Sequence, residues 1–203
     1  MINYLNKLFI ILFFFVPIFL ITGPAIPDII ITFSFLYFLF YYVIIKKNLF
    51  ILKENITLIS VFFWFILIFI SFFAVNKTNS FQDSIIFIRF LFIPIVAYYF
   101  FFSNKRNIRI SVYIIFLTVI FVLADSLFQF FNYTSKDGFG SDLLGFKSDW
   151  YGRLTGPFGD ELVPGAYVSK FGLIGYIFFF YLKTNKFNNF MEVSYLSTVC
   201  VVC

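Results

Sequence analysis

Seven polar side chains stand out in a chain that is 62% hydrophobic and only 12% charged. They are Arg89, Asp125, Gln129, Arg153, Asp160, Glu161 and Lys170. Arginine and lysine both bind phosphate groups, and the planar guanidinium does so through a fork of N–H donors. A carboxylate can accept the proton of an attacking hydroxyl. These residue types are therefore suited to chemistry on a phosphate- or diphosphate-bearing substrate.

Arg153 lies in "YGRLTGPFGDELVPGAY", residues 151–167, a polar stretch inside an otherwise apolar chain. A structural interpretation is an ion pair with Asp149 or Asp160. The functional interpretation is phosphate binding. In the same stretch, Asp160 and Glu161 precede a helix expected to start at Pro164. They either favour that helix start electrostatically or act as catalytic carboxylates, and we predict them as the catalytic residues.

Arg89 and Asp125 fall inside long apolar runs, where charges are costly and indicate function by default. They either form a structural salt bridge or place Arg89 in a water-filled cavity, with Asp125 positioning an anionic ligand. Gln129 follows Asp125 by four residues and so shares its helix face. Lys170 either extends its ammonium to the membrane surface or adds a third cation to the ligand site.

The elements that must position these residues are transmembrane helices, because a span needs ~20 mostly apolar residues. The runs predict an all-α membrane bundle, a single domain over residues 1–203. We expect six complete spans and a partial seventh, which implies a truncated chain. The expected spans are 4–22, 29–45, 56–75, 81–102, 110–131 and 164–182, with the partial one at 191–203.

Basic residues alternate between the loops. The N-terminus, the second, fourth and sixth loops hold nine Lys and Arg residues, and the other loops hold four. Because basic loops stay in the cytoplasm, we expect a cytoplasmic N-terminus and a long external loop over residues 132–163. The net charge of +5 then reflects membrane topology and requires no nucleic-acid partner. Apolar anchors such as Phe139, Leu144 and Trp150 predict that this loop is ordered against the bundle.

The chain contains no histidine, so chemistry that needs an imidazole is absent from these residues. Its two cysteines, Cys200 and Cys203, are spaced C-x-x-C, which without further ligands does not close a zinc site. We expect them to pack as small apolar residues, and we expect neither a metal nor a cofactor.

The stretch "RLTGPFGDELVPGAYVSKF", with "FIRF" and "DSLFQ" before it, resembles the O-antigen ligase and O-antigen polymerase family of bacterial inner-membrane proteins. The similarity is strongest over residues 125–171. Members of that family have further spans and a larger periplasmic loop downstream, so the resemblance implies that this chain is an N-terminal portion. The donor type is common to ligases and polymerases.

The resemblance implies a metal-independent glycosyltransferase that works on the periplasmic side of the membrane. Its donor would be an undecaprenyl-diphosphate-linked saccharide. On the family pattern, Arg89 and Arg153 match arginines that engage the diphosphate. Two alternatives are a lipid-oligosaccharide or other anion transporter, for which broken helices and an internal repeat would be expected, and a non-catalytic scaffold.

Overall fold

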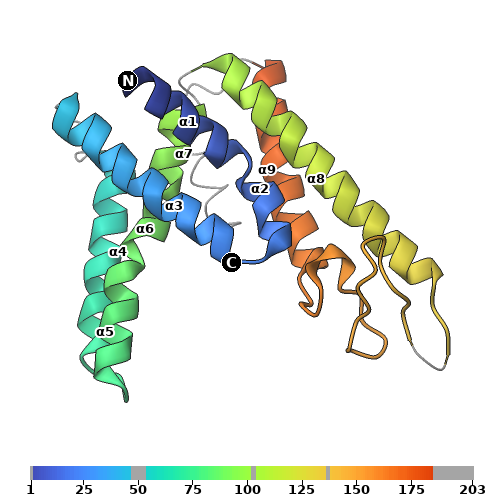
Figure 1. Cartoon of the computed structure of the whole chain (residues 1–203). Helices are drawn as coiled ribbons and strands as arrows, with labels where there is room; N and C mark the ends of the chain where they lie inside the picture. The colour runs from blue at the N-terminus through green and yellow to red at the C-terminus, as the bar shows by residue number, and fades with distance from the viewer. Residues whose placement is uncertain (1, 47–53, 102–103, 136–137, 185–203) are drawn as a thin grey trace.

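The computed structural model describes residues 2–46, 54–101, 104–135 and 138–184, and helices dominate these stretches (Figure 1). In chain order they are α1 (Ile2–Phe14), α2 (Val16–Phe19), η1 (Leu20–Thr22), α3 (Ala25–Phe38), η2 (Leu39–Ile45), α4 (Asn55–Ser71), α5 (Lys77–Ile86), α6 (Ile88–Leu91), α7 (Ile93–Phe101), α8 (Lys105–Phe131), η4 (Gly156–Phe158) and α9 (Pro164–Thr184). Across these stretches there are only isolated β-bridges and no strand. The predicted all-α class is confirmed.

Four helical stretches are long and apolar enough to cross a membrane. They are Ala25–Ile45, Lys77–Phe101, Lys105–Phe131 and Pro164–Leu182. A fifth is obtained if Tyr4–Phe14 and Val16–Thr22, which meet at 47°, form one bent span. At 17 residues, α4 is shorter than the ~20 that a span needs. The six expected complete spans are therefore not confirmed, whereas the apolar helices are compatible with a membrane protein. The predicted partial span and both cysteines lie outside the described residues.

The bend in the first span occurs at a proline. Pro17 lies in the first turn of α2, and its ring removes the N–H that would continue the helical hydrogen bonds. The carbonyl of Pro17 has a hydrogen-bond partner on another helix, because the buried Tyr167 hydroxyl of α9 donates a 2.7 Å bond to it. This hydrogen bond connects the break in the first span to α9, the last described helix.

Aromatic side chains fill the core where α1, α7 and α9 meet. The ring of Phe13 lies 5.6 Å from that of Phe100 and 5.4 Å from that of Phe101, and Phe101 in turn contacts Phe178 at 6.0 Å. The outer surface is also apolar, with large exposed side chains on every long helix. Exposed apolar area on that scale marks a surface covered by another apolar phase or by a partner, and lipid fits that description.

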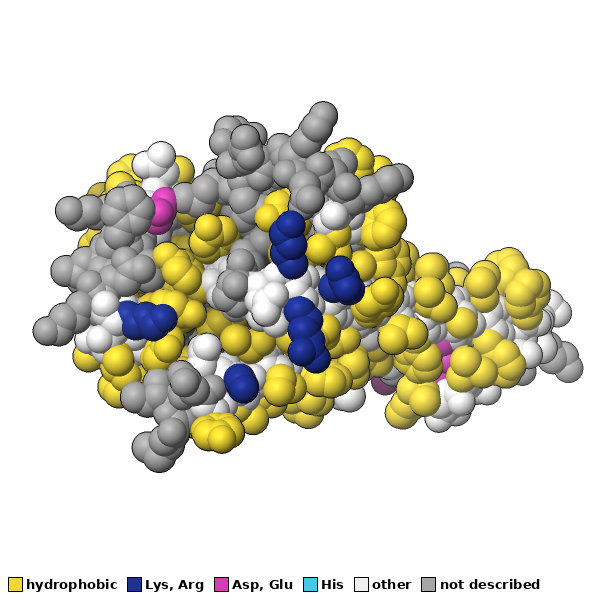
Figure 2. All heavy atoms as spheres, turned by 90° about the horizontal axis from the view of Figure 1, so that it is seen from above, with side chains coloured by type: hydrophobic (Ala, Val, Ile, Leu, Met, Phe, Trp, Pro, Cys, Tyr) yellow, Lys and Arg dark blue, Asp and Glu magenta, His cyan; other side chains and the backbone are white. Residues whose placement is uncertain are grey.

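The helix ends divide into two groups. The start of α1, the end of η2 and the start of α8 lie at the upper end of the molecule in Figure 1. Figure 2 views that end, where Lys and Arg side chains gather. The exposed basic residues of these helix ends are Lys7, Lys46, Lys105, Arg106 and Arg109. The α4–α5 turn and residues 138–163 lie at the opposite end. The described basic helix ends therefore gather at one end of the fold, while Lys47, Lys53, Lys136 and Lys186 of the predicted alternation lie outside the described residues.

Candidate functional site

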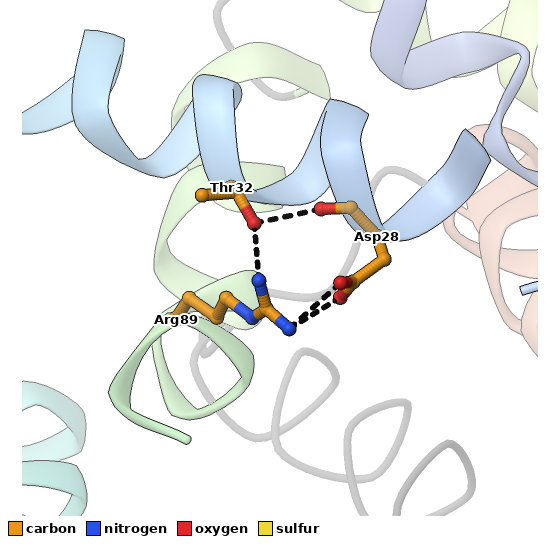
Figure 3. Close-up of polar contacts among 3 residues, drawn as sticks. All are labelled: Asp28, Thr32 and Arg89. Atoms are coloured by element: carbon orange, nitrogen blue, oxygen red, sulfur yellow. Dashed lines mark hydrogen bonds and ion pairs between the residues drawn. The ribbon is translucent and has the colours of Figure 1, made fainter. Parts of the chain in front are cut away.

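The first polar cluster is centred on Arg89 in α6, the one-turn segment between α5 and α7. This segment packs against α3 (Figure 1). Nη2 of Arg89 lies 2.7 Å from Oδ1 and 2.8 Å from Oδ2 of Asp28. Nη1 donates a 2.6 Å hydrogen bond to the hydroxyl of Thr32 (Figure 3). Arg89 is thus held by two residues of α3 that lie one helical turn apart.

The hydroxyl of Thr32 also donates to the backbone carbonyl of Asp28 at 2.7 Å. Because its proton is used in this bond, the hydroxyl oxygen accepts from Arg89 through a lone pair; Figure 3 shows both contacts of the hydroxyl. Asp28 belongs to the first turn of α3, where the helix macrodipole favours a negative charge. The carboxylate is therefore stabilised from two sides, by the guanidinium and by its own helix.

The cluster is incomplete in one respect. Nε–H of Arg89 is buried and has no hydrogen-bond acceptor, although the side chain as a whole remains 20% exposed and that of Asp28 38% exposed. Arginine presents Nε and Nη2 side by side as one edge of its fork, which matches two oxygens of a carboxylate or phosphate. Asp28 uses only the Nη2 half of that edge. The arginine consequently retains a donor for a further oxygen.

The second polar cluster joins α8 to the loop that follows it. Gln129 is fully buried, and its side-chain oxygen accepts hydrogen bonds from the backbone N–H groups of Thr155 and Gly156, both at 3.0 Å. Its amide nitrogen donates to the Thr155 hydroxyl at 3.2 Å. One glutamine therefore satisfies three groups of the "TGP" turn and ties residues 155–156 to the helix.

Asp125 forms the second attachment, one turn before Gln129. It is fully buried, and its Oδ1 accepts a 2.8 Å hydrogen bond from the backbone N–H of Leu143. Its Oδ2 has no donor. The loop is held locally as well, since Oδ1 of Asp142 accepts from the N–H of Phe146 at 2.6 Å. The predicted order of this loop agrees with these contacts.

Gly156 explains why the turn lies so close to α8. Its φ of +53° favours glycine, and a Cβ there would lie 2.7 Å from Oγ of Ser126 and 3.7 Å from Oδ2 of Asp125. A side chain would therefore push the turn off the helix. Elsewhere in the same loop, a hydrogen bond with Tyr133 raises the pKa of the Tyr151 hydroxyl above its usual value.

The remaining predicted residues of the loop lie next to this anchored turn, and their side chains take no part in the hydrogen bonds of Gln129. Arg153, Asp160 and Glu161 are exposed. Within the described residues, none of the three forms an ion pair, so the interpretation of Arg153 as a partner of Asp149 or Asp160 is wrong. Lys170 is half-buried on α9.

The expected contact between Arg89 and Asp125 is not formed, because Arg89 binds Asp28 and Asp125 binds the loop. The structure also does not join the seven predicted residues into one cluster. Sequence reasoning missed Asp28 and Thr32 because the expected span began at residue 29 and left Asp28 outside it. Their spacing of four residues at the start of an apolar run was the available signal, since such residues share a helix face.

Across the described residues, no group of three or more His, Cys, Asp or Glu side chains is arranged to hold a metal ion. Comparison with protein-family models, with curated proteins and with solved structures found no match for this chain. The residues of the two clusters are therefore the basis for a functional conclusion.

Proposed function

We propose that this chain is an O-antigen ligase- or polymerase-like glycosyltransferase that acts on undecaprenyl-diphosphate-linked saccharides. The observation that carries the proposal is the turn anchored by Gln129. It holds the family-like motif rigidly on α8 while Arg153, Asp160 and Glu161 face outward. A rigid frame that carries exposed charged side chains is suited to positioning a substrate.

The proposed chemistry transfers a glycosyl group from a lipid diphosphate to an acceptor hydroxyl. The bond between the anomeric carbon and the diphosphate oxygen breaks, and the hydroxyl oxygen forms the new bond to that carbon. The leaving diphosphate gains negative charge, which cationic side chains would stabilise. The candidates are Arg153 and Lys170 on the side of the anchored turn, and Arg89 in its separate cluster with Asp28. Asp160 or Glu161 would take the acceptor proton. Asp125 and Gln129 support the site by holding the loop, and the reaction needs no metal or cofactor.

The proposed setting is the inner membrane of a bacterium, with the lipid bilayer as a partner and a cytoplasmic N-terminus. The basic helix ends at one face of the fold support this orientation. In the six-span arrangement, α4 crosses with the residues that flank it, and the loop at 132–163 is periplasmic. A membrane-impermeant thiol reagent tests the orientation on Ser141→Cys in a chain with Cys200 and Cys203 replaced by serine. Labelling that occurs only after lysis would indicate the opposite orientation, with residue 141 in the cytoplasm.

The activity is tested by complementing surface-polysaccharide assembly in a strain that lacks the protein. Arg153→Lys should lose most of the function at normal protein level, because lysine lacks the bidentate fork. Lys147→Ala is the matched control, since it removes another exposed cation of the same loop. Wild-type polysaccharide from Arg153→Lys and Arg153→Ala would contradict the assignment of Arg153 to the diphosphate.

A lipid-oligosaccharide or other anion transporter is the alternative, and the 47° break in the first span favours it, because transporters use broken helices at their binding sites. The two functions differ in chemistry. Purified full-length protein should release polyprenyl diphosphate from the saccharide donor if it is a transferase. A transporter would move the intact donor across vesicles and leave that bond unbroken.

A further inference from the structure

The Arg89 cluster combines features that a purely structural ion pair does not need. The pair is partly exposed, the guanidinium keeps a buried N–H without an acceptor, and its second nitrogen is occupied by a neutral hydroxyl. A pair optimised for stability would use both nitrogens of one fork edge on one carboxylate. Here the carboxylate contacts a single nitrogen through both of its oxygens.

We propose that Asp28 is an internal stand-in for an anionic ligand: it occupies Arg89 in the empty protein and is displaced when a diphosphate binds. This inference rests on the proposed function, which supplies the ligand class. A phosphate group offers several oxygens, so it can engage Nε and Nη2 together, whereas Asp28 engages only Nη2. The incoming ligand therefore gains a hydrogen bond that the resident carboxylate does not make.

The displaced carboxylate keeps a favourable position. Asp28 lies in the first turn of α3, where the N-terminal end of the helix continues to stabilise its charge. Its side chain is already 38% exposed, although Oδ1 is buried beside Arg89, so a rotation of the side chain is enough to bring the carboxylate into solvent. Thr32 stays bonded to the carbonyl of Asp28 and keeps its lone pair directed at Arg89. The exchange thus moves one side chain and leaves both helices in place.

The stand-in has two physical consequences. An unpaired arginine in an apolar surface is costly, and Asp28 neutralises that charge until the ligand arrives. The same carboxylate competes with the ligand and lowers its affinity. Removing the charge of Asp28 should therefore strengthen diphosphate binding, the opposite of what a residue that merely supports the site would do.

The test measures binding of farnesyl diphosphate to the purified full-length protein in detergent, with farnesol as the uncharged comparison. Asp28→Asn should bind the diphosphate about tenfold more tightly than wild type, because a charge-assisted bond no longer has to be broken. Arg89→Gln should lose most of the binding, and the double variant should gain nothing from Asp28→Asn. Asp83→Asn is the matched control, since it removes an exposed carboxylate of α5, on the same candidate span as Arg89, and should leave affinity unchanged.

A second measurement uses the wild-type protein and does not depend on a variant that folds. A membrane-permeant carbodiimide reacts with accessible carboxyl groups, and mass spectrometry locates the product. Farnesyl diphosphate should increase modification of Asp28, because the ligand releases it from Arg89. Protection of Asp28, or no change in its modification at saturating ligand, would overturn the inference.

The outcomes separate the two proposals. Wild-type protein that binds farnesyl diphosphate no better than farnesol contradicts the proposed function and the inference together. Diphosphate binding that is unchanged or weaker in the folded Asp28→Asn variant keeps the proposed function and overturns the stand-in role of Asp28. Equal tightening in Asp83→Asn would show a general charge effect and would also overturn it.

Discussion

The two polar clusters of this molecule solve the same problem in opposite ways. Both bury hydrogen-bonding groups among apolar helices. At Gln129, one neutral side chain satisfies two backbone N–H groups and a hydroxyl. At Arg89, a charged group is balanced by one carboxylate and one hydroxyl and still has a donor to spare.

This difference distinguishes polar groups that hold the fold together from polar groups that can bind a ligand. The Gln129 cluster cannot be removed by substituting side chains, because its partners are main-chain groups that must be satisfied in an apolar setting. The partners at Arg89 are side chains, so the whole cluster can be replaced. The Gln129 cluster is therefore required for the fold. The Arg89 cluster is not, so it is available to bind a ligand.

Replacing the neutral anchor should have the largest effect. Gln129→Leu leaves two buried N–H groups and the Thr155 hydroxyl unpaired, at about 1–3 kcal/mol for each group. The free energy of unfolding should fall by about 3 kcal/mol or more, and proteases should cleave residues 138–163 faster. Gln82→Leu, at an exposed position of α5, is the control. Adding Thr155→Val should not restore stability; full recovery would remove the distinction between the clusters.

The charged cluster should behave differently under the same kind of double substitution. Arg89→Leu alone leaves Asp28 without its partner and should lower the free energy of unfolding by about 1–3 kcal/mol. This is less than for a fully buried pair, because both side chains are partly exposed. Arg89→Leu combined with Asp28→Leu should recover most of the loss. The measurement is a double-mutant cycle of unfolding in detergent, and a double variant less stable than either single one would contradict the comparison.

A single neutral hydrogen bond gives a reference value for the stability losses expected at both clusters. Tyr167→Phe removes the donor to the Pro17 carbonyl and keeps the aromatic packing with Phe158 and Phe171. The expected loss in thermal stability corresponds to about 1 kcal/mol. Tyr176→Phe, on the exposed side of α9, should cause no measurable change. A similar loss in both variants would show that the buried bond contributes nothing specific.

The exposed charges of the loop should contribute least to stability. Asp160→Asn and Glu161→Gln each change an exposed carboxylate, so the free energy of unfolding should stay within about 0.5 kcal/mol of wild type. Polysaccharide complementation should nevertheless fall in at least one of them if these residues accept the proton. Unchanged complementation in the double variant would exclude both as the base.

Much of the fold could be predicted because hydropathy reports helices directly. The span expected at 164–182 is found as Pro164–Leu182, while the one expected at 110–131 begins earlier, at Lys105. Helices continue into the charged interface because their terminal turns are stabilised by caps, such as the Asn104 side chain that accepts from the N–H of Arg106. Hydropathy does not register these turns, so helix starts were placed too late.

The partners of the polar residues could not be predicted in the same way. Arg89 was expected beside Asp125, since the two lie on consecutive predicted spans. The fold instead packs α6 against α3 and gives Arg89 the carboxylate of Asp28, 61 residues earlier in the chain. Which helices become neighbours depends on how aromatic side chains fit together, and one sequence does not report that fit. The order of the 138–163 loop was predicted from apolar anchors, but that reason was wrong, because Leu144 and Trp150 are each 54% exposed. The loop is held instead by the hydrogen bonds of Asp125 and Gln129.

The bond between Tyr167 and Pro17 has a consequence for biosynthesis. The two residues are 150 positions apart, so if the bent first pair of helices spans a membrane, it enters that membrane long before its donor has been synthesised. During that interval the carbonyl at the bend has no partner from α9, and an unsatisfied carbonyl in hydrocarbon costs several kcal/mol. Water, lipid headgroups or the insertion machinery must cover it until α9 arrives. The N-terminal bend is thus among the first parts of the chain to be inserted and among the last to be completed.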